Sequence, residues 1–323
     1  MLMEKDILKK SHVLTFYQEM LKIRFFEDIL DDYNQQGQIH GTIHLYNGQE
    51  AIATGICQAL KQDDLVLSTH RNHGHAIAKG VDTYQMFAEM FGKKTGTNGG
   101  RGGSMHISNH SLGFIGGNGI VGGNFPIALG LAQAIKMKGE KRIVVCFSGD
   151  GATNEGTFHE AMNIAALWQL PIIFVIENNQ YAMSSPIEKM MSVPNLSLRA
   201  NNYGMKGIRI NGNNVFEVFQ TMQNLVHREA FTPVLIEAQT YRFKGHSRSD
   251  QEVYRTDDEV SFWKNYYDPI EHMEEALMSD YDIKKDALEQ LKQKIYGELL
   301  VEAQRAFNDD APEMEELTRN IYA

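Results

Sequence analysis

The sequence has little cysteine, no long apolar run and no excess of basic residues. Its 323 residues include two cysteines, Cys57 and Cys146, both within apolar segments, so we expect free thiols and no disulfide framework. The formal net charge of -10 argues against nucleic acid or an anionic membrane as a partner. The apolar runs are too short for a membrane span, and the amino terminus lacks a signal peptide's apolar core, which predicts a soluble cytoplasmic protein.

Short apolar runs alternate with amphipathic segments, which is typical of an α/β fold. We expect a mostly parallel central sheet flanked by helices, with an amino-terminal helical segment at 1–35 and a carboxyl-terminal one at 257–323. The length allows a single domain over 1–323. Strands are expected at 64–69, 143–147, 172–176, 207–210 and 233–240, and helices at 11–34, from 49, at 125–136 and at 215–228.

The most informative stretch runs from Gly149 to Tyr181 and starts with GDGATNEG. Asp150 follows the predicted strand at 143–147, and Asn179 closes the run ENN after the predicted strand at 172–176. The segment between them predicts one crossover helix, capped by Thr153 or Asn154. Because such a crossover makes the two strands parallel, Asp150 and Asn179 can meet at the ligand-binding edge of the sheet.

A carboxylate, a carboxamide oxygen and a backbone carbonyl, such as that of Tyr181, form a hard oxygen site for Mg²⁺ or Ca²⁺. Gly149 and Gly151 allow a diphosphate close to the backbone, and a helix amino terminus offers unpaired N–H groups. Asp-Gly and Asn-Asn are each common in turns, so the pair at this spacing carries the prediction, not either piece alone.

Several histidines and arginines lie at other predicted strand ends. The run HRNHGH, which starts at His70, has the pattern H-x-x-H-x-H, but loop histidines without a cysteine or carboxylate partner argue against zinc. Arg71 is better explained as a phosphate clamp than as a surface salt bridge. The last predicted strand leads into YRFKGHS, which places Arg242 and His246 on another loop.

The segment 92–123 is rich in glycine and includes a G-x-G-x-x-G match at 117–122. We reject a dinucleotide fingerprint because SNHSLGF, before it, does not read as a buried strand and no ribose-binding acid follows at the required distance. The glycines instead predict close approach of the backbone to a bulky ligand, on loops that can reorganise. After Tyr181, weak periodicity predicts a long surface loop or lid up to Gly204.

Several blocks together resemble one known family. HLYNGQEA, THRNHGHAIAKG, GRGGSMH, GGNGIVGG, GDGATNEG with ENN, and YRFKGHSRSD resemble the alpha subunit of the first component of 2-oxo acid dehydrogenase complexes, in the pyruvate and acetoin branch. The GDG…NN pair resembles the thiamin diphosphate signature. The resemblance implies a thiamin diphosphate-binding fold with Mg²⁺ as the second cofactor. His70 resembles acetoin-type members, whereas pyruvate-type members often have a tyrosine there, and Lys244 replaces a histidine of some pyruvate-type relatives.

The resemblance also assigns roles to residues. Those matching His44 and His246 are catalytic, and a loop carrying Ser247 and Ser249 is phosphorylated in mitochondrial members. Metal binding falls on Asp150, Asn179 and the Tyr181 carbonyl, and cofactor binding on His70, Arg71, Gly119, Val121, Gly149, Asp150, Gly151, Ala152, Asn179, Arg242 and His246.

By this resemblance the chain forms hydroxyethyl-thiamin diphosphate from acetoin or pyruvate and passes the acetyl unit to the lipoyl group of a dihydrolipoyl acyltransferase. Acetoin is favoured over pyruvate, and a non-catalytic scaffold is the alternative from another class. The sequence leaves no second βα series for a pyrimidine-binding domain, so we expect a beta subunit in a heterotetramer of two alpha and two beta chains. The rival is that Glu50 supplies the pyrimidine carboxylate within this chain.

Overall fold

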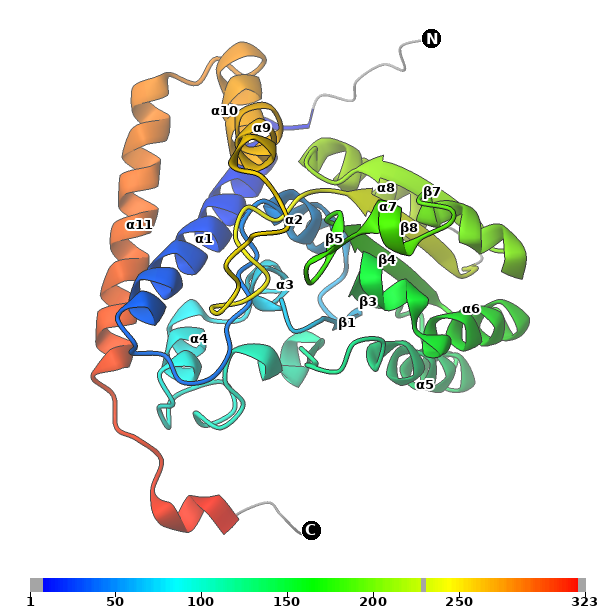
Figure 1. The fold of residues 1–323 in the computed structure, drawn as a ribbon, viewed down its shortest axis with the longest axis horizontal. Helices are drawn as coiled ribbons and strands as arrows, with labels where there is room; N and C mark the ends of the chain where they lie inside the picture. The colour runs from blue at the N-terminus through cyan, green and yellow to red at the C-terminus, as the bar shows by residue number, and fades with distance from the viewer. Residues whose placement is uncertain (1–7, 228–230, 319–323) are drawn as a thin grey trace.

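The computed structural model describes residues 8–227 and 231–318, and shows helices packed on both faces of a central sheet (Figure 1). The expectation about a signal peptide falls mainly on residues 1–7, and the predicted end of one helix at Arg228; both lie outside the described residues. Within them, no helix is long and apolar enough to cross a membrane.

The sheet has six strands that all pair in parallel, which confirms the predicted α/β fold. β-branched and other apolar residues fill the central strands, as expected where helices cover both faces. Five of the six strands were predicted to within two residues at each end, including one edge strand, whereas the other edge strand, at 114–116, was not predicted. In spatial order the strands are β2 (Phe114–Gly116), β1 (Leu65–Leu67), β3 (Val144–Gly149), β4 (Ile172–Asn178), β8 (Val234–Gln239) and β7 (Lys206–Asn211).

Alternate residues of each strand face two separate cores. Val145 and Phe147 of β3 belong to the larger core, while Val144 and Cys146 face the smaller one. The smaller core is covered by α5 (Asn124–Met137), α6 (Gly156–Trp168) and the 3₁₀ segment η4 (Leu196–Tyr203). The larger core is covered by α1 (Lys10–Gln35), α2 (Glu50–Ala59), α3 (His73–Ala78), α4 (Thr83–Met90) and α8 (Val215–Val226).

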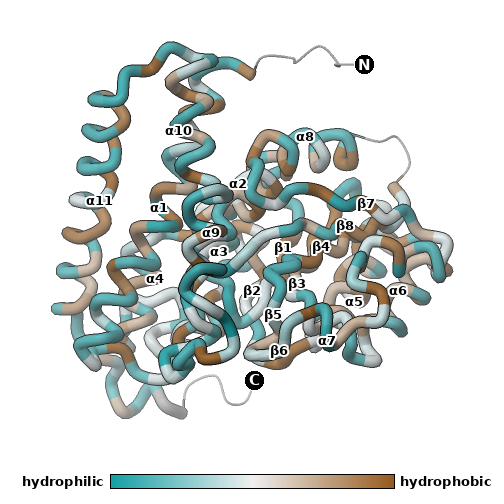
Figure 2. Tube along the Cα trace, turned by 45° about the horizontal axis from the view of Figure 1, so that its top comes forward, coloured by the Kyte–Doolittle hydropathy of each residue, from teal (hydrophilic) through white to brown (hydrophobic). Residues whose placement is uncertain are grey.

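The carboxyl-terminal segment adds α9 (Asp257–Tyr267), α10 (Pro269–Ser279) and α11 (Lys285–Phe307). Apolar and polar residues alternate along α11 (Figure 2), and its buried face packs against α1 and α4. The expected helix does not continue to the end, because an irregular stretch separates α11 from the short 3₁₀ segment η5 (Met314–Thr318). The segment is also less peripheral than expected. Glu259 of α9 accepts hydrogen bonds from the hydroxyls of Tyr181 (2.9 Å) and Tyr241 (2.8 Å).

Two local predictions are wrong. The region after Tyr181 is not a long loop: it contains the hairpin β5 (Tyr181–Ala182) and β6 (Ser185–Pro186), then α7 (Ile187–Met190) and η4, all tied down by buried apolar residues. The crossover helix is not capped at Thr153 or Asn154, because Asp150–Asn154 form a 3₁₀ turn, η3, and α6 starts after the extended residue Glu155.

The glycine-rich segment 92–123 was also interpreted wrongly in part. Its first half wraps around a buried carboxylate of this chain, not a ligand: Glu89 accepts backbone N–H groups of Asn98, Gly100, Gly102 and Gly103 at 2.6–3.0 Å. The argument that no strand precedes the G-x-G-x-x-G match is wrong as well, because β2 ends at Gly116. This edge strand has three residues, and α5 begins only at Asn124. Two short 3₁₀ segments, η1 (Ser104–His106) and η2 (His110–Leu112), precede it.

Candidate active site

A cavity of about 350 Å³ opens at the carboxyl edge of the sheet, where the strand order reverses between β1 and β3. Ligands of open α/β sheets bind at such a point. The structure brings almost all predicted site residues to this cavity; His44 and Gly119 are not in its lining. The predicted residues that line it are His70, Arg71, Val121, Gly149, Asp150, Gly151, Ala152, Asn179, Tyr181, Arg242 and His246.

Asp150 is the buried acid of the cavity. In the sheet Gly149 pairs with Glu177, so the ends of β3 and β4 are level and Asp150 lies near Asn179. Asp150 is 2% exposed, and its Oδ2 atom has no hydrogen-bond partner among the described residues. Burial raises the pKa of Asp150 to about 6. A bound cation would offset that burial, so the carboxylate fits a metal ligand.

Asn179 and Tyr181 stand beside this acid. The Asn179 amide donates to Gln49 Oε1 (3.2 Å), and its own oxygen accepts weakly from the Tyr181 backbone N–H (3.4 Å). The Tyr181 carbonyl accepts an Arg242 N–H at 3.4 Å. These oxygens, together with the Asp150 carboxylate, are the donor set that Mg²⁺ prefers.

Two buried arginines face the same cavity. Burial, and then the charge of Arg242, lower the pKa of Arg71 to about 10. Arg71 donates to the carbonyls of Leu45 and of His246, and Arg242 to those of Tyr181 and Met183. Arg242 Nε lacks a hydrogen-bond partner within the described part of the chain. Two neighbouring guanidinium groups, held mainly by neutral carbonyls, form a site for a polyanion such as a diphosphate.

The glycines around Asp150 have different roles. A Cβ atom on Gly149 would project into open space, and Gly149 lines the cavity, so its lack of a side chain leaves room there. A Cβ on Gly151 would lie 2.5 Å from Ala182 Cβ, so Gly151 also allows the β5–β6 hairpin to pack closely. Gly119 lies near Met105, outside the lining.

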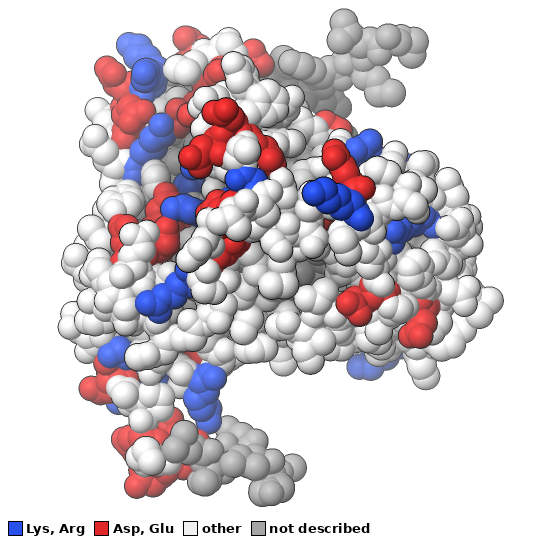
Figure 3. Space-filling model, viewed as in Figure 1, with Lys and Arg blue, Asp and Glu red and all other residues white. Residues whose placement is uncertain are grey.

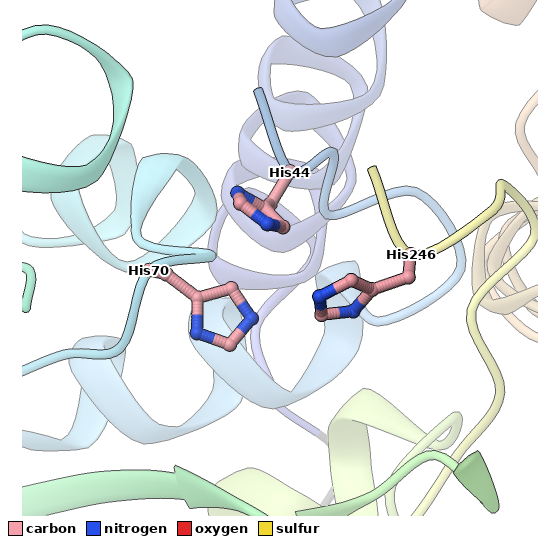
Figure 4. A group of neighbouring side chains, drawn as sticks. All are labelled: His44, His70 and His246. Atoms are coloured by element: carbon pink, nitrogen blue, oxygen red, sulfur yellow. The ribbon is translucent and has the colours of Figure 1, made fainter. Parts of the chain in front are cut away.

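Three histidines from distant segments converge beside the cavity, whose lining includes His70 and His246 (Figure 4). His44 precedes α2, His70 follows β1, and His246 lies on the loop after β8. Their ring centroids are 4.6–5.5 Å apart. Burial and neighbouring positive groups lower their pKa values, to about 2, 3 and 4 in the order given. We call these three residues the mouth triad.

The other histidines of the HRNHGH run behave differently, which corrects their interpretation as loop residues without acidic partners. His73 and His75 lie in α3, fully buried. His73 donates to Glu27 (2.9 Å) and contacts the Ser104 hydroxyl (3.0 Å). We call His73 and His75 the inner pair. The partners of His75 are Ser68 at 2.7 Å and Glu177 at 3.1 Å.

Sequence reasoning missed three polar groups at the cavity. Glu177, which accepts a hydrogen bond from the Tyr46 hydroxyl, lines its wall, as does Ser148, whose buried hydroxyl has no partner in the described structure. Gln49 supports Asn179 from behind. The available signal for Glu177 and Ser148 was their polar character within otherwise apolar buried strands.

Glu50, the rival pyrimidine carboxylate, lies elsewhere. It is fully buried, forms an ion pair with Arg24 at 2.5 Å, and accepts the Gly48 backbone N–H at 3.0 Å. It is not in the cavity lining. The geometry therefore gives Glu50 a structural role.

Comparison with known proteins identifies the family. The model described as "Dehydrogenase E1 component" matches residues 17–315. The chain belongs to this family. The alpha subunit of acetoin:2,6-dichlorophenolindophenol oxidoreductase from Bacillus subtilis is 41% identical to this E1 chain, over 98% of it and 95% of the relative. The alpha subunit of the pyruvate dehydrogenase E1 component from Porphyra purpurea is 39% identical, over 98% of this chain and 94% of the relative.

E1 components are oxidoreductases that use thiamin diphosphate, and the resemblance drawn from the sequence is confirmed. The site fits that cofactor on its own chemistry. A buried acid with a free oxygen, two adjacent guanidinium groups and a partnerless hydroxyl surround a cavity large enough for a ligand. Dehydrogenase E1 membership and the cavity thus point to the same group.

Proposed function

We propose that this chain is the alpha subunit of a two-chain E1 component that acts on acetoin or pyruvate. The observation that carries the proposal is the Asp150 carboxylate, which is buried beside Asn179 with an oxygen atom free and two arginines near the same cavity. A scaffold without activity would not need to keep such a destabilising arrangement. The rival of a dinucleotide-dependent dehydrogenase has no comparable support at the 117–122 loop.

In this proposal Asp150, Asn179 and the Tyr181 carbonyl hold Mg²⁺, and Arg71, Arg242 and His70 hold the diphosphate. Gly149, Gly151 and Ala152 provide the backbone beside it, since all three line the cavity. Gly119 and Val121 place their backbone against the aminopyrimidine. The whole of 1–323 then serves as one diphosphate-binding domain. The bound cofactor supplies the carbanion chemistry, and the chain supplies position, metal and proton transfer.

We propose His44 and His246 as the catalytic side chains. Both rings belong to the mouth triad, and neither makes a side-chain hydrogen bond to any residue that the structure describes. Burial lowers the pKa of both imidazoles, so they are neutral at pH 7 and only weak bases; their unpartnered ring nitrogens can hydrogen-bond to a reacting group and relay a proton. We propose that the acetyl unit then passes to the lipoyl group of a dihydrolipoyl acyltransferase.

The substrate is either acetoin or pyruvate. The two named relatives are similar to the chain to nearly the same degree, and a second acetoin-type alpha subunit, from Cupriavidus necator, is 38% identical over 98% of the chain. His70 favours acetoin, as the sequence resemblance implies. Comparing the two substrates at equal concentration on the reconstituted complex decides between them: a higher kcat/KM for pyruvate would reverse the preference.

A beta subunit completes the proposed assembly. The relatives are named alpha subunits, which supports this part of the proposal. Ile120 and Val121, beside the cavity, are 73% and 52% exposed. Figure 3 shows a broad uncharged area in the middle and lower part of the face that it draws, whereas charged side chains gather toward the α1 and α11 side. Apolar side chains at a cavity mouth fit a permanent interface, which would also bring the missing pyrimidine carboxylate. We propose two alpha and two beta chains.

The metal assignment is tested by Asp150→Ala. Removing the anionic ligand leaves the diphosphate without its bridging cation, so we expect no detectable binding of thiamin diphosphate in the presence of Mg²⁺. Isothermal titration calorimetry on the folded variant measures this directly. The matched control is Asp63→Ala, an exposed acid before β1, which should bind as the wild type does. Wild-type affinity in Asp150→Ala would refute the assignment.

A further inference from the structure

The mouth triad has a second chemical property besides proton transfer. One ligand nitrogen from each of its three rings lies within 4.8 Å of the others. Within the described residues no hydrogen bond reaches any of the three rings, and the buried Nδ1 of His44, a residue 6% exposed, is without a partner. Figure 4 shows the rings turned toward one another, from three separate segments. A shared ligand would satisfy all three at once.

The chemistry of the donors selects the kind of ligand. Neutral imidazole suits Zn²⁺, Cu²⁺ and Ni²⁺, whereas Mg²⁺ and Ca²⁺ prefer oxygen. Nitrogens bound to one tetrahedral Zn²⁺ at about 2.0–2.1 Å are about 3.3 Å apart, so the rings need to close by roughly 1.5 Å at most. His44 and His246 lie outside helices and strands, so the rings can close without breaking a hydrogen bond of a helix or of the sheet.

We propose that His44, His70 and His246 form an inhibitory binding site for Zn²⁺, separate from the Mg²⁺ site at Asp150. Three protein nitrogens leave a fourth position for water, as in zinc sites that are not structural. Occupation would engage the nitrogens of His44 and His246. If the proposed function holds, Zn²⁺ therefore inhibits acetyl transfer; the binding itself does not depend on that function.

Two features of the surroundings set the strength of the site. Tightly bound zinc usually has histidine ligands whose second nitrogen is held by a carboxylate or carbonyl, and the triad has no such support from the described residues. Arg71 lies beside the triad and repels a cation. Both effects weaken binding, so the site is suited to reversible inhibition and not to a permanent structural metal.

Titration of the purified chain with Zn²⁺, in competition with a chromogenic chelator, tests the proposal, and Co²⁺ replaces Zn²⁺ to give a visible spectrum that reports tetrahedral nitrogen ligands. We expect one bound ion per chain. His70→Ala and His44→Ala should weaken binding by about 10- to 100-fold or more, because the loss of outer partners alone costs that much. His70→Gln serves as a second variant in case the alanine variant does not fold.

The controls separate this site from others. His106→Ala and His110→Ala remove exposed histidines outside the triad and should bind Zn²⁺ as the wild type does. Asp150→Ala should also keep its Zn²⁺ affinity although it loses thiamin diphosphate, so the zinc result stands or falls independently of the proposed function. Absence of Zn²⁺ binding to the wild type, or binding that the triad variants leave unchanged, would overturn the proposal.

Discussion

The inner pair and the mouth triad show how one residue type serves two purposes within a few residues of sequence. His73 and His75 lie in α3 with every ring nitrogen in contact with a hydroxyl or carboxylate. His70, three residues before His73, points instead toward His44 and His246, and no described residue hydrogen-bonds its ring. Partnered imidazoles hold elements together. Partnerless ones at a cavity are available to a ligand or a proton.

The partners of the inner pair explain what it connects. Glu27 of α1 holds His73 and also accepts the Tyr46 backbone N–H at 2.9 Å, while Ser104 ties His73 to the glycine-rich segment. His75 joins β1, through Ser68, to the Glu177 end of β4. The inner pair therefore holds together α1, β1, β4 and the glycine-rich segment behind the cavity. The mouth triad lies on segments next to these elements. Variants of the two groups should separate stability from activity.

The largest effect is expected for His246→Ala in the mouth. Loss of a general acid or base reduces acetyl transfer by about 10²- to 10⁴-fold. The free energy of unfolding should change by no more than about 0.5 kcal/mol, because the ring has no hydrogen bond to lose. Transfer to a lipoyl domain by the reconstituted complex measures the first effect, and urea denaturation the second. Arg248→Ala, at an exposed residue of the same loop, is the control; full transfer activity in His246→Ala would contradict the role.

For Glu27→Ala, behind the cavity, we expect a large loss of stability. The change leaves a buried imidazole N–H and the Tyr46 amide unpaired, which costs about 2–5 kcal/mol of unfolding free energy. Asp32→Ala removes an exposed acid of the same helix and should cost less than about 0.5 kcal/mol. Equal stability of the two variants in urea would show that the inner pair does not anchor the fold.

A smaller effect concerns pH. The lowered pKa values of the triad mean that the unfolded chain takes up protons below about pH 6.5, where the folded chain does not until about pH 4 or lower. Since the unfolded state binds more protons in this window, stability falls as the pH drops through it. His70→Ala lacks one such group, so its stability should fall less than that of the wild type between pH 6.5 and 4. Parallel urea midpoints across this range would contradict the environment described for the triad.

The sequence predicted those features that depend on short-range pattern. Apolar runs locate β3 and β4, and the rule for parallel crossovers then brings Asp150 and Asn179 to one edge, as the structure confirms. The sequence could not predict which histidines of the HRNHGH run have hydrogen-bond partners and which do not. That difference depends on Glu27, which is 46 residues distant from His73. The same holds for the glycines around Glu89: their pattern indicates close approach, but only the fold reveals to what.

The site residues outside the motifs were missed for a related reason. Glu177 belongs to a buried strand, and its importance comes from Tyr46 and His75, which arrive from other elements. The predicted start of the crossover helix was wrong, because five residues of 3₁₀ turn separate β3 from Glu155 and α6. Tertiary contacts, and not propensity, determine both.

The central claim is that the mouth of this cavity is half of a site and that a beta subunit supplies the rest. The most direct test measures acetyl transfer by the purified chain alone, with saturating thiamin diphosphate and Mg²⁺ and either acetoin or pyruvate, before and after its beta subunit is added. We predict no turnover by the chain alone and full recovery on mixing. Robust turnover by the isolated chain, shown by mass spectrometry to be free of beta subunit, would contradict the account and direct attention to Glu177 as a carboxylate within the chain.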